Sequence, residues 1–196
     1  MRTKKIELKL KTFDELSEEQ KSEVIGKNRY INVEHDFWND FLLEEFLNKV
    51  KEKTIFEFEA DDIVWAVGGR DACFGVYGKT VEGQINEKYA DKGVLDVGVP
   101  NKVGVGLNHM GGGICQPVHT QYSRADIDFE DDISESEADT LTKEINEQID
   151  TVIELAQEYF KKNTQLYDDL TDDENVADTL RINEYEFNDE TLEIEG

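Results

Sequence analysis

Apolar and polar residues alternate along this chain with two different periods. In two long stretches the apolar residues recur every three or four positions, which is the spacing of one face of a helix. The first stretch predicts a helix from about His35 to Lys53, and the second predicts a helix over 135–163. Two shorter helices are predicted to follow capping-box sequences. They run from Ser17-Glu18-Glu19-Gln20 to about Arg29 and from Thr171-Asp172-Asp173-Glu174 to about Leu180.

A period of two residues marks the predicted strands. Ile6, Leu8 and Leu10 alternate with charged residues, which indicates a half-buried strand over 5–12. Residues 79–101 follow neither period, so no element is assigned to them. The remaining strands are predicted at 63–67 and 73–77 as a hairpin or as two strands flanking a loop, at 103–107, over 118–129 as one or two strands, and at 185–194 as a closing hairpin.

These elements predict an α+β fold in which an antiparallel sheet packs against two main helices, 35–53 and 135–163. A chain of 196 residues fits one domain, 1–196. The charged residues are distributed unevenly between two parts of the chain. Residues 1–125 hold 21 Asp+Glu and 17 Lys+Arg, whereas 126–196 hold 25 and 4. The prediction is therefore a near-neutral, sheet-rich part followed by an acidic helical part, with net charges of −4 and −21.

A surface this negative repels nucleic acids and membranes and attracts proteins with basic grooves. The expected partner is therefore a basic nucleic-acid-binding protein, with no direct binding to nucleic acid or membrane. Two cysteines do not make a disulfide framework. The N-terminal residues lack the apolar run of a signal peptide, and no stretch is long enough to span a membrane. The expected location is the cytoplasm of the cell that makes the protein.

Eight carboxylates are the candidate partner-binding residues. Four of them recur every three or four positions on the long acidic helix and form one ridge. The other four precede or begin the next predicted helix and form a second patch. An exposed acidic face that only confers solubility is the alternative interpretation. The ridge is Glu147, Asp150, Glu154 and Glu158, and the second patch is Asp168, Asp169, Asp172 and Asp173.

Catalytic chemistry is weakly indicated. Cys73, His109, Cys115 and His119 are the residues that zinc or a Cys–His dyad would use, but no Cys-x-x-Cys pair anchors them. The glycines at 111–113 lack the lysine of a phosphate-binding loop, so a flexible turn is expected there. We expect no catalytic residues, no metal and no cofactor, and a protein that is not an enzyme. A small metal- or Cys/His-dependent hydrolase remains an alternative.

Three parts of the sequence resemble a family of small phage and mobile-element proteins, some of which carry antitoxin or anti-restriction labels. The resemblance brings no established catalytic residues. It covers both ends and part of the middle, where a Gly-containing loop precedes an Ala-Cys-Phe segment. The matching segments are Phe13–Glu19, Arg29–Val33 and Asp36–Trp38 near the start, Trp65–Phe74 in the middle, and Tyr167–Glu174 with Asn183–Phe187 near the end.

The resemblance implies a phage setting and a role in evading host defences. Together with the charge it predicts a counter-defence inhibitor that binds a CRISPR effector or a restriction enzyme through an acidic, DNA-mimicking surface. An antitoxin that neutralises a basic toxin is the leading alternative, because the same electrostatics would serve it. The pattern leaves monomer and homodimer both open, and it leaves the roles of the 68–74 and 109–119 loops undecided.

Overall fold

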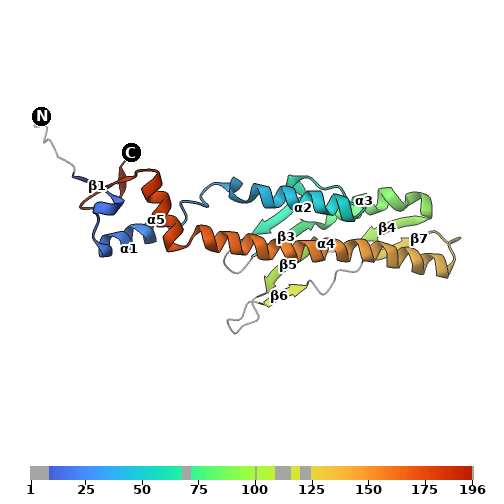
Figure 1. Ribbon diagram of the computed structural model, residues 1–196. Helices are drawn as coiled ribbons and strands as arrows, with labels where there is room; N and C mark the ends of the chain where they lie inside the picture. The colour runs from blue at the N-terminus through green and yellow to red at the C-terminus, as the bar shows by residue number, and fades with distance from the viewer. Residues whose placement is uncertain (1–8, 68–71, 100, 109–115, 120–124, 196) are drawn as a thin grey trace, which may run out of the picture. The chain divides into compact units, whose positions relative to one another are not determined.

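The structure is a computed structural model that describes residues 9–67, 72–99, 101–108, 116–119 and 125–195. Its class is α+β, as the sequence predicts. The chain forms two compact units. Unit 1 combines residues 1–38 with 165–196, and unit 2 comprises 39–164. The boundary predicted from charge, at residue 125, does not coincide with this division. The elements and their order are drawn in Figure 1.

Unit 1 is built from both ends of the chain. Its sheet has the order β1-β8-β9 with antiparallel pairing, and two short helices lie on its core. Phe13, Val24, Leu180 and Phe187 are fully or almost fully buried there. The elements are β1 (Leu10–Thr12), the 3-10 helix η1 (Phe13–Glu15), α1 (Glu18–Lys27), α5 (Asp173–Ile182), β8 (Glu186–Asn188) and β9 (Ile194–Glu195).

The helix starts in unit 1 show how local signals act. The Ser17 hydroxyl accepts from the Gln20 backbone N–H at 3.3 Å, and the Gln20 side chain accepts from the Ser17 N–H at 3.1 Å, so the predicted capping box is confirmed. The capping box predicted at Thr171 is wrong. The Thr171 hydroxyl donates to the Tyr167 carbonyl oxygen because the preceding helix continues to Leu170, and Asp172 caps α5 instead.

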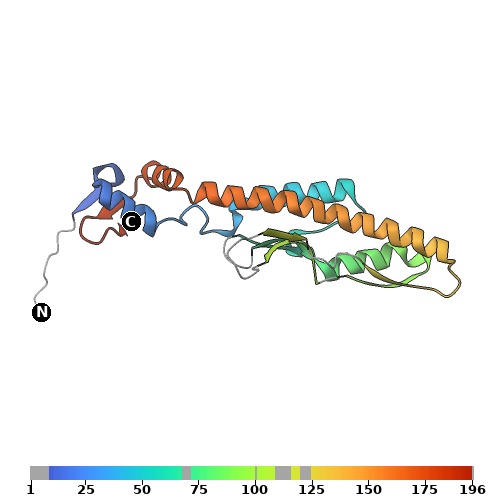
Figure 2. The same ribbon diagram turned by 90° about the horizontal axis from the view of Figure 1, so that it is seen from below.

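Unit 2 contains a four-stranded antiparallel sheet of order β2-β3-β5-β6 and a separate pair, β4-β7. Figure 2 shows α2 and α4 together on one face of the larger sheet. Helix α4 (Glu135–Leu170) ends in unit 1, and a 3-10 turn, η2 (Asp36–Asn39), precedes α2. The other elements are α2 (Asp40–Lys53), the 3-10 helix η3 (Ala60–Asp62), β2 (Ile63–Ala66), β3 (Cys73–Tyr77), α3 (Gly78–Tyr89), η4 (Ala90–Lys92), β4 (Val94–Gly98), β5 (Lys102–Asn108), β6 (Gln116–His119) and β7 (Asp126–Phe129).

Three aromatic rings join the layers of unit 2. Phe46 of α2 meets Phe74 of β3 edge to face at 5.0 Å between ring centroids, and it meets Tyr159 of α4 at 5.5 Å. Phe74 and Tyr159 stack at 6.2 Å. All three are at most 1% exposed. Edge-to-face and offset arrangements of this kind contribute about 0.5–1.5 kcal/mol per pair beyond burial, so the two helices and the sheet share one core.

The structure differs from the predicted elements in several places. One sheet was expected, but among the described residues there are three small ones. The unassigned stretch 79–101 contains α3 and β4. Only Val81, Ile85 and Tyr89 mark the buried stripe of α3, and Gly83 weakens its helical pattern. Residues 5–8 of the first predicted strand lie outside the described residues.

The apolar face predicted for the helix at 35–53 is only partly buried. Leu42, Phe46 and Val50 enter the core, but Phe37 is 66% exposed and Phe41 is 59% exposed. The reason is that α2 begins only at Asp40, so Phe37 lies in a 3-10 turn whose residues do not continue the α-helical face. Aromatic residues that the pattern assigned to the core are therefore at the surface.

The negative charge is shared between the units. Unit 1 has 20 Asp+Glu and 9 Lys+Arg, a net of −11, and unit 2 has 26 and 12, a net of −14. The strong asymmetry along the sequence thus disappears on folding, because the acidic last third of the chain contributes its residues to both units. Each unit by itself is acidic enough to repel polyanions.

Gly75 and Gly104 face each other across β3 and β5 at very close approach. A Cβ on Gly75 would collide with the Val103 backbone. We predict that Gly75→Ala lowers the free energy of unfolding by about 1–3 kcal/mol, the usual cost of overpacking. Gly83→Ala is the matched control. Gly83 is at an exposed position of α3 and nothing lies within 4 Å of the added Cβ, so a gain of about 0.5–1 kcal/mol is expected. Urea unfolding measures both, and equal effects would refute the close-approach argument.

Candidate partner-binding surfaces

The ridge Glu147, Asp150, Glu154 and Glu158 occupies the exposed face of α4. All four residues are exposed, as the sequence predicts. The opposite face carries the buried residues of the helix, which recur with the same period. The amphipathic pattern places the carboxylates and the core residues on opposite sides of one helix. The buried residues of α4 in unit 2 are Ile145, Ile149, Val152, Ile153, Leu155, Ala156, Tyr159, Phe160 and Asn163.

The ridge carboxylates differ in their partners. Glu158 pairs with Lys49 of α2 at 3.1 Å and with Lys162 at 2.9 Å. Glu147 lies 3.7 Å from Lys143. Within the described residues, Asp150 and Glu154 make no ion pair. The two central residues of the ridge therefore carry its uncompensated charge, and Glu158 has a structural role.

Glu158 belongs to a cluster around Tyr159 that connects α2 with α4. The ammonium groups of Lys162 and Lys49 lie over the Tyr159 ring at 4.4 and 5.3 Å from its centroid. The hydrogen bond from Lys162, followed by that from Lys49, lowers the pKa of Glu158. The adjacent Tyr159 hydroxyl, then Lys49 and Lys162, lower the pKa of Glu45. The Tyr159 hydroxyl is buried beside these groups without a hydrogen bond of good geometry.

The second patch divides in the same way. Asp173 pairs with the Arg29 guanidinium at 2.7 Å. Asp172 caps α5 by accepting from the Glu174 N–H at 3.0 Å. Asp168 and Asp169 are exposed at the end of α4, and in the described part of the chain they make no ion pair. The structure thus leaves two carboxylates available in each patch.

Aromatic side chains lie beside the second patch. No sequence pattern identified them as exposed residues. Tyr30 is 59% exposed and stacks on Tyr167 with 6.5 Å between ring centroids. Trp38 meets Tyr167 at 5.9 Å. Burial, then the nearby Tyr30 and Asp168, raises the pKa of Tyr167. No local pattern indicates this cluster, because Tyr30 and Tyr167 come from opposite ends of the chain.

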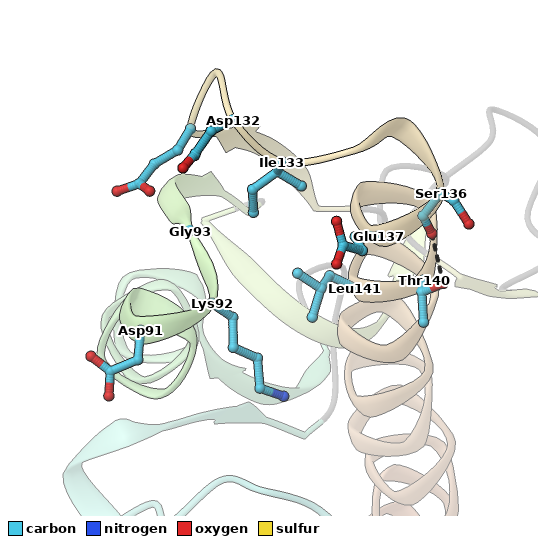
Figure 3. Close-up of a pocket in the computed structure, with 10 residues that line it drawn as sticks. Asp91, Lys92, Gly93, Asp132, Ile133, Ser136, Glu137, Thr140 and Leu141 are labelled. Atoms are coloured by element: carbon cyan, nitrogen blue, oxygen red, sulfur yellow. Dashed lines mark hydrogen bonds between the residues drawn. The ribbon is translucent and has the colours of Figure 1, made fainter.

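An open hollow of about 580 Å³ lies in unit 2 between the turn that follows α3 and the start of α4 (Figure 3). Its lining includes the carboxylates Asp91, Glu130, Asp132 and Glu137. Glu137 accepts a hydrogen bond from the Ser134 hydroxyl at 2.5 Å, so it serves the helix start. Among the described residues no group of three or more His, Cys, Asp or Glu has the arrangement of a metal site.

The Cys/His candidates are not brought together in the described structure. His109, Cys115 and the glycines at 111–113 lie outside the described residues. Cys73 is half-buried in β3 and His119 ends β6, with β5 between them. Strands spaced about 4.8 Å apart put these two residues about 10 Å apart across the sheet.

Comparisons with protein-family models, with curated proteins and with solved structures find no match to this chain. In the part of the chain that the structure describes, no helix combines the length and apolar character required to cross a membrane.

The Tyr159 cluster predicts a specific pH dependence. The carboxyls of Glu158 and Glu45 have lowered pKa values in the folded state, so their stabilisation is present above the unfolded pKa of about 4.3 and is lost as the pH falls through the folded value. Glu158→Gln should therefore be less stable than wild type near neutral pH and should approach wild-type stability in acid.

The measurement is urea unfolding between about pH 7 and about pH 3. Glu154→Gln is the control on the same face, because no ion pair is lost with it. Equal stability of Glu158→Gln and wild type at neutral pH would show that the Lys49 and Lys162 contacts contribute nothing.

Proposed function

We propose that this protein is a phage-type counter-defence inhibitor that binds a nucleic-acid-targeting host defence protein, a CRISPR effector or a restriction enzyme. Binding occurs through exposed carboxylates that occupy a cationic groove built for a phosphate backbone. The observation that carries the proposal is that four exposed carboxylates of the two predicted patches make no ion pair in the described structure: Asp150, Glu154, Asp168 and Asp169.

The spacing of Asp150 and Glu154 supports the mimicry. They are one helical turn apart, about 6 Å along the axis at 1.5 Å per residue. Each strand of duplex DNA places one phosphate per about 3.4 Å of its axis, so this pair approximates every second phosphate of one strand. Internal ion pairs hold Glu147 and Glu158, and the proposal therefore assigns less of the binding to these two than to the central pair.

The exposed carboxylates indicate a partner with a positively charged binding groove. A groove lined by lysine and arginine loses its own repulsion when it binds carboxylates, which favours both encounter rate and selectivity. The resemblance to phage and mobile-element proteins supports a defence nuclease as the owner of such a groove. Neutralisation of a basic toxin uses the same attraction and is distinguished by experiment.

The Asp150→Lys/Glu154→Lys variant is predicted to lose inhibition while remaining folded. Both side chains are exposed and lack ion pairs in the described structure, and surface substitutions of this type usually change stability by no more than about 0.5 kcal/mol. The measurement is cleavage of plasmid DNA by a purified CRISPR effector or restriction enzyme, with increasing amounts of the protein. Inhibition should weaken as salt rises, because the Debye length falls from about 10 Å at 0.1 M towards about 3 Å at 1 M.

The control is Glu52→Lys/Glu87→Lys, which makes the same change in charge at exposed positions of α2 and α3. This control should inhibit like wild type. Equal loss in both variants would mean that net charge, and not the ridge, is responsible. Absence of inhibition across a panel of defence nucleases, together with rescue of cells from a co-expressed basic toxin, would replace the proposal with the antitoxin function. A shift of free duplex DNA by the protein alone would contradict both.

A further inference from the structure

The chain repeatedly places a cation over an aromatic ring with carboxylates at the side. In unit 1 the guanidinium of Arg181 lies over the Phe13 ring at 5.1 Å from the centroid. Its nitrogens contact Asp14 at 3.0 Å and Asp178 at 2.8 Å. A cation over an aromatic face is attracted by the ring's negative electrostatic potential, and the carboxylates fix its position.

Unit 2 contains the same arrangement twice. Lys162 and Lys49 lie over Tyr159 beside Glu158, as described above. Lys92 lies over the Tyr89 ring at 4.8 Å and is 3.8 Å from Glu144, which also accepts from the Tyr89 hydroxyl at 2.9 Å. In all three cases the ring, the carboxylate and the cation come from this chain, and the arrangement joins elements of one unit.

At Tyr30 and Tyr167 the rings and a neighbouring carboxylate are present, but no cation from the described residues accompanies them. The two rings stack, and the exposed Asp168 directly follows Tyr167 on α4. No cation of the described chain lies over either ring. Arg29, next to Tyr30 in the chain, is directed to Asp173 at 2.7 Å and to the Thr171 carbonyl oxygen at 3.1 Å.

We propose that the surface formed by Tyr30, Tyr167 and Asp168 binds an arginine side chain of the partner protein. The guanidinium would lie over the exposed Tyr30 ring and pair with the Asp168 carboxylate. The inference rests on the proposed function for the identity of the partner, and it adds a second contact to the ridge on α4. Tyrosine and arginine are also the residue types that most often dominate the energy of protein interfaces.

Charge complementarity selects an arginine-bearing protein over other occupants of an aromatic surface. Unit 1 has a net charge of −11, so a nucleic acid that stacked its bases on Tyr30 would bring phosphates to an already negative surface. Arginine is favoured over lysine because its planar guanidinium stacks on a ring while its N–H groups bond a carboxylate. The basic groove of a nucleic-acid-binding protein is rich in such side chains.

The test measures binding of two octapeptides, one alternating arginine with glycine and the other alternating lysine with glycine, by isothermal titration calorimetry on the full-length protein. Wild type should prefer the arginine peptide. Tyr30→Ala should lose about two- to fivefold in affinity for it, the range expected for an exposed cation–π contact. Tyr30→Phe keeps the ring and should bind like wild type.

Tyr77→Ala is the matched control, because Tyr77 is 48% exposed in unit 2 and none of the cations described above lies over its ring. It should retain the preference for arginine. Thermal melting verifies that each variant is folded. If Tyr30→Ala fails to fold, Asp168→Asn replaces it, since this variant removes the charge at an exposed position and should weaken binding of the arginine peptide more than Glu87→Gln does.

Equal binding of both peptides by wild type, or an arginine preference that Tyr30→Ala retains, overturns the inference. So does binding of single-stranded oligothymidylate that depends on Tyr30. Because the peptide assay uses no nuclease, it tests the arginine contact independently of the proposed inhibitor function. Equal binding of the two peptides by a wild-type protein that still inhibits a nuclease removes the arginine contact and leaves the proposed function. A Tyr30-dependent arginine preference in a protein that inhibits no nuclease removes the proposed function and leaves the contact.

Discussion

Burial of the apolar stripe of α4 is the interaction on which unit 2 depends. The exposed face of this helix places like charges three and four residues apart, which destabilises an isolated helix by a few tenths of a kcal/mol per pair. The opposite face buries Ile145, Ile149, Val152 and Tyr159 completely. Each large apolar side chain that leaves water contributes about 1.5–3 kcal/mol. Packing therefore outweighs the repulsion, and the helix presents its carboxylates on a fixed support.

Most basic residues in the described part of the chain form internal ion pairs. Lys49 and Lys162 hold α2 and α4 together around Tyr159. In unit 1, Arg181 joins α5 to η1 through Asp14, and Arg29 fixes the start of α5 through Asp173. These cations bind particular carboxylates and leave others without a partner in the described structure. The fold therefore determines which carboxylates are unpaired, and these are fewer than the number of Asp and Glu in the sequence suggests.

Local signals allowed much of the fold to be predicted from sequence. The capping box at Ser17, the start of α4 near residue 135, and the hairpins β2-β3 and β8-β9 each depend on neighbouring residues, and all are found. The division of the strands into three sheets was not predicted, because it depends on pairings between distant residues, such as that of β1 with β8. The end of α4 was also misplaced, although the contacts there are local. Helix α4 continues past residue 163, and the Thr171 hydroxyl consequently belongs to its last turn.

The candidate surfaces were predictable only in part, for the same reason. Helical periodicity places Asp150 and Glu154 on an exposed face, and the structure agrees. The pairing that separates them from Glu158 joins Lys49 to a residue 109 positions later, which no periodic pattern encodes. The stack of Tyr30 on Tyr167 likewise requires the two ends of the chain to meet in unit 1. Sequence spacing identified the carboxylates, and only tertiary contacts show which of them are available.

The division into two units helps to rank the two proposed binding surfaces, the one at Tyr30 and Asp168 in unit 1 and the ridge in unit 2. The segments on which the proposed resemblance to phage and mobile-element proteins rests are 13–19, 29–33, 36–38, 167–174 and 183–187 in unit 1, and 65–74 in unit 2. If counter-defence is a property carried by that resemblance, the surface at Tyr30 and Asp168 has the stronger claim to be the shared contact. The ridge at Asp150 and Glu154 lies outside the resembling segments, so it would adapt this particular chain to its own target. Under the proposed function, these two acidic surfaces would supply recognition and selectivity by the same attraction, each on its own compact unit.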